Sequence, residues 1–458
     1  MLERLGLPKR RPHRRLGPDE PLAPLPSGFL WGAATADQQI ERQQPSDWTV
    51  FEERAARERR GIAGLEQGAR WLAHKSDFDA HFADDVARAA DMGHGAHRFS
   101  MSWARLFPRE DMAGPEQAGI DFYGRVLDEL ERHRLAPFVT LFHFASPAWL
   151  WRPSGADGGR GVERADAPGR LAQLARTLVD VFGDRVRHWC TINEPVVYAY
   201  LGYLEGTFPP NEQRGGPLAA DGVLTALLRM HEAAAAALRE AARRRGTSAQ
   251  VGIAQHARTF LPWRNSAPLD RVTAAIVERL FVRRFFDHAM PSCDYVGVNE
   301  YGRAYLETEL RRPLAYRVRH ADPSDPEDDA SELGWAPDEH AFEERLVALG
   351  RRYQKPIYVL ENGTAEASVD DQRRQRQLVR HAQAMARAVR RGADVRGYFH
   401  WSLVDNFEWA EGFGPRFGLY AVDYQGGCAR AARGSVDVYR SIARGNAVPA
   451  ELWARLGR

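Results

Sequence analysis

The chain has 458 residues, of which 44% are hydrophobic and 27% carry a charged side chain, and its formal net charge is +2. These proportions exclude a disordered or fibrous chain, and no stretch approaches the ~18 consecutive apolar residues of a membrane span. The first 17 residues hold six Lys or Arg against one Glu, which leaves a charge of about −3 on the body and excludes a basic nucleic-acid-binding surface there.

The N-terminal residues 1–27 form a basic and then proline-rich tail that ends in PDEPLAPLPS. We expect this tail to be a disordered, solvated arm, and tethering to nucleic acid or to a membrane is the less favoured alternative. No apolar run of signal-peptide length follows the arginines, so the sequence predicts a cytoplasmic protein.

Eight short apolar runs follow the tail, and amphipathic segments with helical periodicity separate them. The runs, which we predict to be strands, are residues 29–34, 95–101, 137–143, 186–192, 251–256, 293–298, 356–360 and 395–401. Helices are predicted at residues 77–93, 120–134, 167–183, 272–289 and 371–392. Eight strands alternating with helices predict a single (β/α)8 barrel over residues 28–458. The alternative is a large open doubly wound sheet, but the glycine-rich phosphate loop typical of such sheets is absent after the first strand.

Polar and aromatic residues occur at the C-terminal ends of seven predicted strands, which is where the catalytic residues of a barrel lie. In chain order these positions are Gln39 and Glu41, Arg98, His143, Asn193 and Glu194, Asn299 to Tyr301, Glu361, and Trp401 with the DNFEW loop at 405–409. The fifth strand ends in Gln255 and His256, to which no role is assigned. The long stretches 102–115 and 302–337 are also predicted to lie on this face.

Each of these residues also has a structural explanation when it is taken alone. Glu194 could be a solvated strand end before Pro195, Arg98 an ion-paired rim residue, His143 a satisfied core histidine and Trp401 part of the core. Taken together, they place two glutamates, on the fourth and seventh strands, at opposite sides of one cavity, or cup, at the C-terminal ends of the strands. Two carboxylates facing one ligand suit hydrolysis of a glycosidic bond, and the aromatic rings and amides suit a sugar.

No metal or other cofactor is expected, because no cluster of Cys, His or Asp has the spacing of a metal site. The cysteines Cys190, Cys293 and Cys428 are far apart in the sequence and odd in number, so they predict no disulfide framework.

Seven motifs in order resemble those of glycoside hydrolase family 1, the retaining β-glucosidases and β-glycosidases. They are FLWGAAT with Gln39, HRFSMSWARLFP, LFHFASP, TINEP followed by GYLEG, YVGVNEY, IYVLENG, and GYFHWSLVDNFEWAEGFGPRFGLYAVDY. The resemblance extends from about residue 28 to about residue 445. It implies a (β/α)8 barrel, an O-glycosyl hydrolase, and an oligosaccharide or an aryl or alkyl β-glycoside as substrate.

The resemblance also implies roles for individual residues. Glu194 would be the general acid/base and Glu361 the nucleophile, with Arg98, Tyr301 and Asn299 holding and tuning the nucleophile. Asn193 would bind the 2-hydroxyl of the sugar, and Trp335 would face the leaving group. The subsite for the non-reducing sugar would be lined by Gln39, His143, Trp401, Glu408, Trp409 and Phe417, with Gln39 and Glu408 binding the 4-hydroxyl.

The sequence departs from the family pattern at several positions near these motifs. Arg42 replaces a glycine after Glu41, the HWDLP-like stretch reads HFASP, the NYY motif reads NEY, and the GWEIYP-like segment reads GWAPDE. None of these changes removes a predicted catalytic residue. Glu300 is expected to add a carboxylate near the cup, and the altered loops leave the leaving-group preference open.

Three other functions remain to be weighed. A 6-phospho-β-glycosidase is disfavoured because Glu408 would repel a phosphate. A catalytically dead sugar-binding protein should have lost Glu194, Glu361 or Arg98. A transglycosylase shares every catalytic group, so the sequence does not distinguish it. The preferred sugar and the oligomeric state are also left open.

Overall fold

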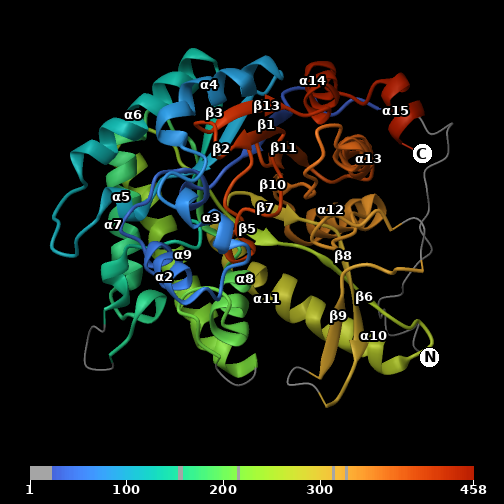
Figure 1. The fold of residues 1–458 in the computed structure, drawn as a ribbon, viewed down its shortest axis with the longest axis horizontal. Helices are drawn as coiled ribbons and strands as arrows, with labels where there is room; N and C mark the ends of the chain where they lie inside the picture. Colours follow the sequence, from blue (N-terminus) through green and yellow to red (C-terminus); the bar gives the residue numbers. More distant parts are fainter. Residues whose placement is uncertain (1–22, 153–157, 214–216, 312–314, 325–327, 458) are drawn as a thin grey trace.

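The computed structural model describes residues 23–152, 158–213, 217–311, 315–324 and 328–457. Eight parallel strands close into a barrel in the order β1-β11-β10-β7-β5-β4-β3-β2, and helices surround them (Figure 1). The strands are β1 (Leu30–Ala34), β2 (Ala96–Ser100), β3 (Ala136–Phe142), β4 (His188–Asn193), β5 (Gln250–His256), β7 (Val296–Glu300), β10 (Ile357–Asn362) and β11 (Val395–Trp401). Each coincides with one of the eight apolar runs, so the predicted barrel is confirmed.

One set of helices surrounds the barrel on its outside (Figure 1). They are α4 (Phe78–Asp91), α6 (Gln117–Arg132), α7 (Ala167–Phe182), α9 (Pro217–Arg245), α10 (Pro268–Val277), α11 (Arg284–Ala289), α12 (Glu339–Tyr353), α13 (Gln372–Arg390), α14 (Ser435–Gly445) and α15 (Ala450–Leu456). Local sequence fixes where some of them begin. The side chain of Asp338, for example, accepts a hydrogen bond from the backbone N–H of Ala341 and caps α12.

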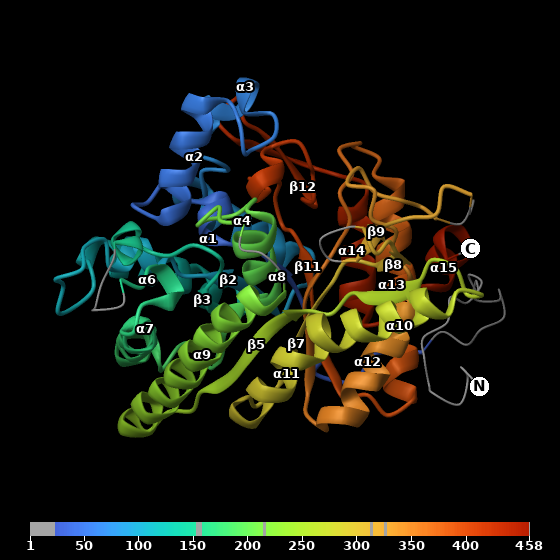
Figure 2. The same cartoon turned by 90° about the horizontal axis from the view of Figure 1, so that it is seen from below.

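A second set of helices occupies the loops at the C-terminal ends of the strands. They are α1 (Asp37–Ile40), α2 (Asp47–Glu58), α3 (Leu65–Gly68), α5 (Trp103–Leu106) and α8 (Pro195–Tyr200), with a π-helical turn over Leu201–Glu205. The stretch 302–337 contains strands that the sequence did not predict. Within it, β8 (Arg303–Thr308) pairs with β9 (Tyr316–Arg319) and with β6 (Thr259–Pro262) beside α10 (Figures 1 and 2). A second small sheet pairs β12 (Tyr420–Asp423) with β13 (Ala429–Ala432).

Aromatic side chains fill the N-terminal half of the barrel interior. The ring of Phe138 lies 4.7 Å from that of Phe399 and 5.2 Å from that of Tyr358, measured between ring centroids. Tyr295 packs against Tyr358 at 5.3 Å and donates a hydrogen bond to the carbonyl of Trp189. Because this end is packed with side chains, a ligand can enter the barrel only from the C-terminal ends of the strands.

The described chain is already packed at Leu25, ahead of the boundary expected at residue 28. Leu25 is buried, its N–H bonds to the carbonyl of Asn446, and the Asn446 side chain donates to the carbonyls of Leu25 and Pro26. The rest of the predicted tail, residues 1–22, lies outside the described residues. No helix in the described ranges has both the length and the apolar character needed to cross a membrane.

Candidate active site

A cavity of about 430 Å³ opens at the C-terminal ends of the strands. Six strands or the loops that follow them line it: β3 with His143, β4 with Asn193 and Glu194, β5 with His256 and Arg258, β7 with Tyr301, β10 with Glu361, and β11 with Trp401, Glu408, Trp409 and Phe417. Trp335, from the long stretch after β7, also lines the cavity. The stretch 102–115, by contrast, contributes none of the lining residues.

Glu194 enters the cavity because the chain turns sharply at the end of β4. Its backbone has φ 43° and ψ 58°, a left-handed conformation that residues other than glycine seldom adopt, and Pro195 begins α8. Side chains of consecutive strand residues point to opposite faces, so an unbroken strand would send Asn193 and Glu194 apart. The left-handed turn instead lets both residues line the same cavity.

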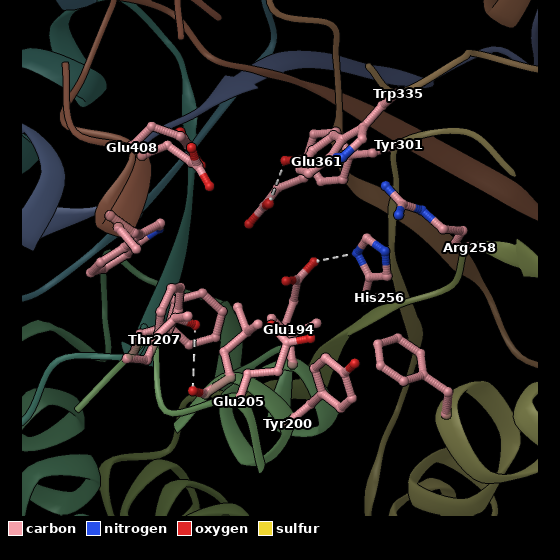
Figure 3. Close-up of a pocket in the computed structure, with 18 of the residues that line it drawn as sticks. Glu194, Tyr200, Glu205, Thr207, His256, Arg258, Tyr301, Trp335, Glu361 and Glu408 are labelled. Atoms are coloured by element: carbon pink, nitrogen blue, oxygen red, sulfur yellow. Dashed lines mark hydrogen bonds and ion pairs between the residues drawn. The ribbon is translucent and has the colours of Figure 1, made fainter. Parts of the chain in front are cut away.

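The carboxylate of Glu194 has two neighbours on one of its oxygens. Oε1 accepts a hydrogen bond from Nδ2 of Asn299 at 3.0 Å and lies 3.0 Å from Nδ1 of His256. Both contacts use Oε1, so Oε2 is the oxygen available toward the cavity. Figure 3 shows the Glu194 carboxylate directed into the cavity, with His256 beside it.

Glu361 is held by donors on both of its oxygens. Nη1 of Arg98 donates to Oε1 at 2.5 Å, and the hydroxyl of Tyr301 donates to Oε2 at 2.7 Å. Burial raises the pKa of Glu361 to about 7, and the charge of Arg98 and the Tyr301 hydroxyl act in the opposite direction. The carboxylate therefore becomes ionised near neutral pH.

One hydrogen-bond network joins the two glutamates. Oδ1 of Asn193 accepts from Nη2 of Arg98 at 2.7 Å and from Nδ2 of Asn299 at 3.1 Å. Because Arg98 also binds Glu361 and Asn299 also binds Glu194, the amide of Asn193 fixes the position of both donors. The two carboxylates point toward each other across the cavity (Figure 3).

Aromatic rings and a carboxylate form the end of the cavity around Glu408. The ring of His143 stacks on those of Trp401 and Trp409, with centroid distances of 5.9 and 6.0 Å. Nε2 of Gln39 donates to Oε2 of Glu408 at 3.3 Å, and burial raises the pKa of Glu408 to about 8. Gln39 is fully buried and stands behind Glu408. Such a surface offers ring faces for the C–H groups of a sugar and directional acceptors for its hydroxyls.

The opposite end of the cavity contains Trp335, which was predicted to face the leaving group. Other residues that line the cavity were assigned no role from the sequence. The ring of Trp335 lies 5.8 Å from that of Tyr301. The unassigned lining residues include His256, Arg258, Glu205, Tyr316 and His320. His256 could have been recognised as the last residue of its strand, but its contact with Glu194 depends on how β4 and β5 pair, which one sequence does not reveal.

Glu300, which was predicted to add a carboxylate near the cup, does not itself line the cavity, although its charge acts on Arg258, which does. Its side chain is fully buried, where Oε1 accepts from the N–H of Gly302 and Oε2 accepts from Nδ2 of Asn362. The alternation of side chains along β7 explains this, because Asn299 and Tyr301 face inward and the residue between them faces outward. Glu300 supports the β7–β10 junction from behind.

The described residues contain no group of three or more His, Cys, Asp or Glu side chains arranged to hold a metal ion. Cys190, Cys293 and Cys428 are all buried free thiols.

Comparison with known proteins gives consistent matches. The model of "Glycosyl hydrolase family 1" matches residues 22–309 and 291–448. A 1,4-beta-D-glucan glucohydrolase of Thermotoga neapolitana is 30% identical over 87% of this chain and 98% of its own length. A bifunctional beta-D-glucosidase/beta-D-fucosidase of Bifidobacterium breve is 33% identical over 91% of this chain and 97% of its own length.

Solved structures with the same fold include a beta-glycosidase from Pyrococcus horikoshii, which superposes with a TM-score of 0.80 at 31% identity and covers 95% of this chain and 98% of its own. A family 1 β-glucosidase from Thermotoga maritima superposes with a TM-score of 0.81 at 26% identity, covering 93% of this chain and 99% of its own.

Proposed function

The chain belongs to glycosyl hydrolase family 1 and is an O-glycosyl hydrolase, and we propose that it is a retaining, exo-acting β-glucosidase that uses Glu361 as nucleophile and Glu194 as acid/base. One observation supports this mechanism above the others. Glu194 and Glu361 face each other across the cavity from β4 and β10, joined through Arg98, Asn193 and Asn299. The names of the relatives, a glucan glucohydrolase and a β-glucosidase/β-fucosidase, support the choice of a β-glucoside as substrate.

In the first step, the ionised Glu361 attacks the anomeric carbon while Glu194 gives its proton to the glycosidic oxygen. The bond between that carbon and the leaving-group oxygen breaks, and a glycosyl ester with Glu361 forms. Arg98 and Tyr301 hold the carboxylate in position for attack. Because the leaving group departs as a neutral alcohol, the negative charge that Glu361 loses appears on Glu194. Asn193 would bind the 2-hydroxyl, an interaction that strengthens in the oxocarbenium-like transition state.

In the second step, water hydrolyses the ester. Glu194 has lost its proton to the departing alcohol and is now a carboxylate, so it takes a proton from the water that attacks the anomeric carbon. Two inversions at this carbon give net retention. This mechanism requires the two carboxyl groups to be about 5 Å apart, whereas about 9 Å would suit inversion.

The end of the cavity around Glu408 would hold the non-reducing sugar. Glu408 would accept a hydrogen bond from the 4-hydroxyl, and the rings of Trp401, Trp409 and Phe417 would pack against the sugar. Gln39, which is buried and does not line the cavity, would hold the Glu408 carboxylate in place through its Nε2. Above its pKa of about 8, the ionised carboxylate of Glu408 would repel a 6-phosphate, which disfavours phosphorylated substrates. Since these residues bind the terminal sugar, we propose that the enzyme removes residues one at a time from the non-reducing end.

The test is hydrolysis of a panel of nitrophenyl β-glycosides. For the β-glucoside, the anomer of glucose that is released is followed by proton NMR. We expect the glucoside to be hydrolysed and β-glucose to appear before mutarotation forms the α-anomer. Early release of α-glucose would rule out retention, and failure to hydrolyse any glycoside in the panel would rule out the proposed function.

A further inference from the structure

A buried arginine, Arg258, lies in the wall of the cavity beside Glu194. It follows β5 by two residues, its exposed fraction is 7%, and it lines the cavity together with His256. Figure 3 shows Arg258 and His256 on one side of the cavity and Glu408 on the other. Because Glu194 protonates the leaving-group oxygen in the proposed function, Arg258 lies on the leaving-group side of the bond that breaks.

Arg258 lacks the carboxylate partner that other buried arginines have. Within the described ranges its guanidinium forms no ion pair, and its hydrogen bond joins Nη1 to Nδ1 of His320 at 2.9 Å. Its Nε and Nη2 have no hydrogen-bond partner among the described residues. By contrast, an Asp or Glu pairs with each of Arg98, Arg164, Arg303, Arg345, Arg374, Arg387 and Arg433.

The nearest carboxylates are already bound to other groups. Glu300 accepts from Gly302 and Asn362, and Glu194 accepts from Asn299. Burial lowers the pKa of Arg258 to about 10, against the charges of Glu300 and Glu194, which act in the opposite direction, so the side chain is still a cation at neutral pH. A buried cation with two unused donors destabilises the fold unless an anion meets it, and a ligand that supplied this anion would bind tightly.

The surfaces around Arg258 indicate the rest of such a ligand. Cζ of Arg258 lies 4.8 Å from the ring centroid of Trp335, and the ring of Phe281 packs edge-on against that of His256 at 5.9 Å. Phe260, Phe281 and Tyr316 also line the cavity. These rings favour a flat aromatic group, and a guanidinium favours a carboxylate, whose two oxygens match its paired N–H donors.

Two carboxylates at the mouth of the cavity do not cancel this preference. Glu205 and Glu411 line the cavity but are exposed, so solvent and salt screen their charges. Arg258 is buried, and its charge is screened much less.

We propose that the leaving-group subsite selects aromatic aglycones that carry a carboxylate, which the guanidinium of Arg258 binds. This assignment rests on the proposed function and adds to it the chemical class of the leaving group.

The experiment compares kcat/KM for 3- and 4-carboxyphenyl β-D-glucosides with kcat/KM for their carbamoyl counterparts, which have the same shape and no charge. We expect the wild-type enzyme to prefer at least one acid over its amide by about tenfold, the scale of one charge-assisted hydrogen bond. In Arg258→Gln this ratio should fall to about one, and Arg258→Lys should give an intermediate ratio because it keeps the charge without the paired donors. Using the ratio cancels any general loss of activity.

Arg319→Gln is the matched control, because Arg319 on β9 pairs with Glu307 and does not line the cavity. It should keep the wild-type ratio. A second measurement, calorimetric binding of the acid and the amide to Glu361→Gln, reports the subsite without turnover and should also favour the acid by about tenfold.

If the enzyme hydrolysed the carbamoylphenyl glucosides and preferred neither carboxyphenyl glucoside, the carboxylate subsite would be refuted. The proposed glycosidase function would be unaffected by this result. Tight, Arg258-dependent binding of an acid by a protein that hydrolyses nothing would support the subsite and contradict the proposed function. Equal binding of acid and amide to Glu361→Gln would also overturn the subsite.

Discussion

The hydroxyl of Tyr301 donates a hydrogen bond to Oε2 of Glu361 at 2.7 Å, on the carboxylate oxygen that Arg98 does not bind. Tyr301 follows β7 and Arg98 belongs to β2, so residues from two separate strands hold the two oxygens of one carboxylate. Both donors favour the ionised form, whereas burial favours the neutral form and raises the pKa of Glu361 to about 7. The pKa of Glu361, the proposed nucleophile, therefore depends on a hydroxyl that can be removed without changing a charge.

Tyr301→Phe should move the acid limb of the pH profile to higher pH. Removing a donor to the ionised carboxylate disfavours that form, so the pKa of Glu361 rises above its present value of about 7, and more of the free enzyme is protonated and inactive at a given pH. Loss of one such hydrogen bond corresponds to about one pKa unit. The measurement is kcat/KM for 4-nitrophenyl β-glucoside across the acid limb. A uniform loss of rate with an unmoved midpoint would contradict the assignment of this limb to Glu361.

The two glutamates should be distinguishable by the stereochemistry of azide rescue. Glu361→Gly should abolish hydrolysis of aryl β-glucosides, and azide entering the space of the lost side chain should attack from the opposite face to give the α-glucosyl azide. Glu194→Ala should still form the glycosyl ester from substrates with activated leaving groups, and azide should then attack from the β face to give the β-glucosyl azide.

The products are identified by NMR. Full activity in Glu361→Gly would refute its role as nucleophile, and the same anomer of glucosyl azide from both variants would refute the division of roles.

His256 is predicted to position Glu194, because its Nδ1 lies 3.0 Å from Oε1 of that carboxylate. In His256→Phe the acid is less well oriented, so kcat/KM should fall by about tenfold for substrates whose leaving group needs a proton. The loss should be much smaller for 2,4-dinitrophenyl β-glucoside, whose leaving group departs as an anion. His256→Asn, which keeps a polar group near Glu194, should restore part of the rate. An equal loss on all leaving groups would show that His256 only supports the fold.

The eight barrel strands could be predicted because each is a short apolar run that is buried on both faces. Strands β6, β8 and β9 could not be predicted in the same way. The four residues of β9, for example, are all half-buried and contain two arginines, so they lack the hydrophobic pattern that marks a strand. Their pairing depends on β5 and β7 ending side by side, which is a property of the closed barrel.

The position of a candidate site residue could be predicted where the residue ends a strand. Whether its side chain points into the cavity was harder to predict. Glu300 follows Asn299 directly, yet strand alternation turns its side chain away from the cavity, and the sequence alone did not show this. Asn193 and Glu194 are also consecutive, but the left-handed backbone at Glu194 breaks the alternation and both face inward. Arg258 lies beyond its strand end, and its proposed role follows from having no ion pair with a carboxylate among the described residues, which depends on neighbours far away in the sequence.

Glu408 should control selection against phosphorylated sugars. At a pH above about 8, where its carboxylate is ionised, it would accept hydrogen bonds from sugar hydroxyls and repel a 6-phosphate, so the measurements are made above this pH. Glu408→Ser should lower kcat/KM for 4-nitrophenyl β-glucoside by about tenfold or more, because the acceptor is lost from a buried site. It should also lower the preference for this substrate over its 6-phosphate, because the repulsion is gone. Glu411→Ser, which removes an exposed carboxylate three residues away, serves as the control and should leave the preference unchanged. If Glu408→Ser kept the wild-type preference, the discrimination would have to arise from the shape of the cavity, and Glu408 would act only as a hydrogen-bond acceptor.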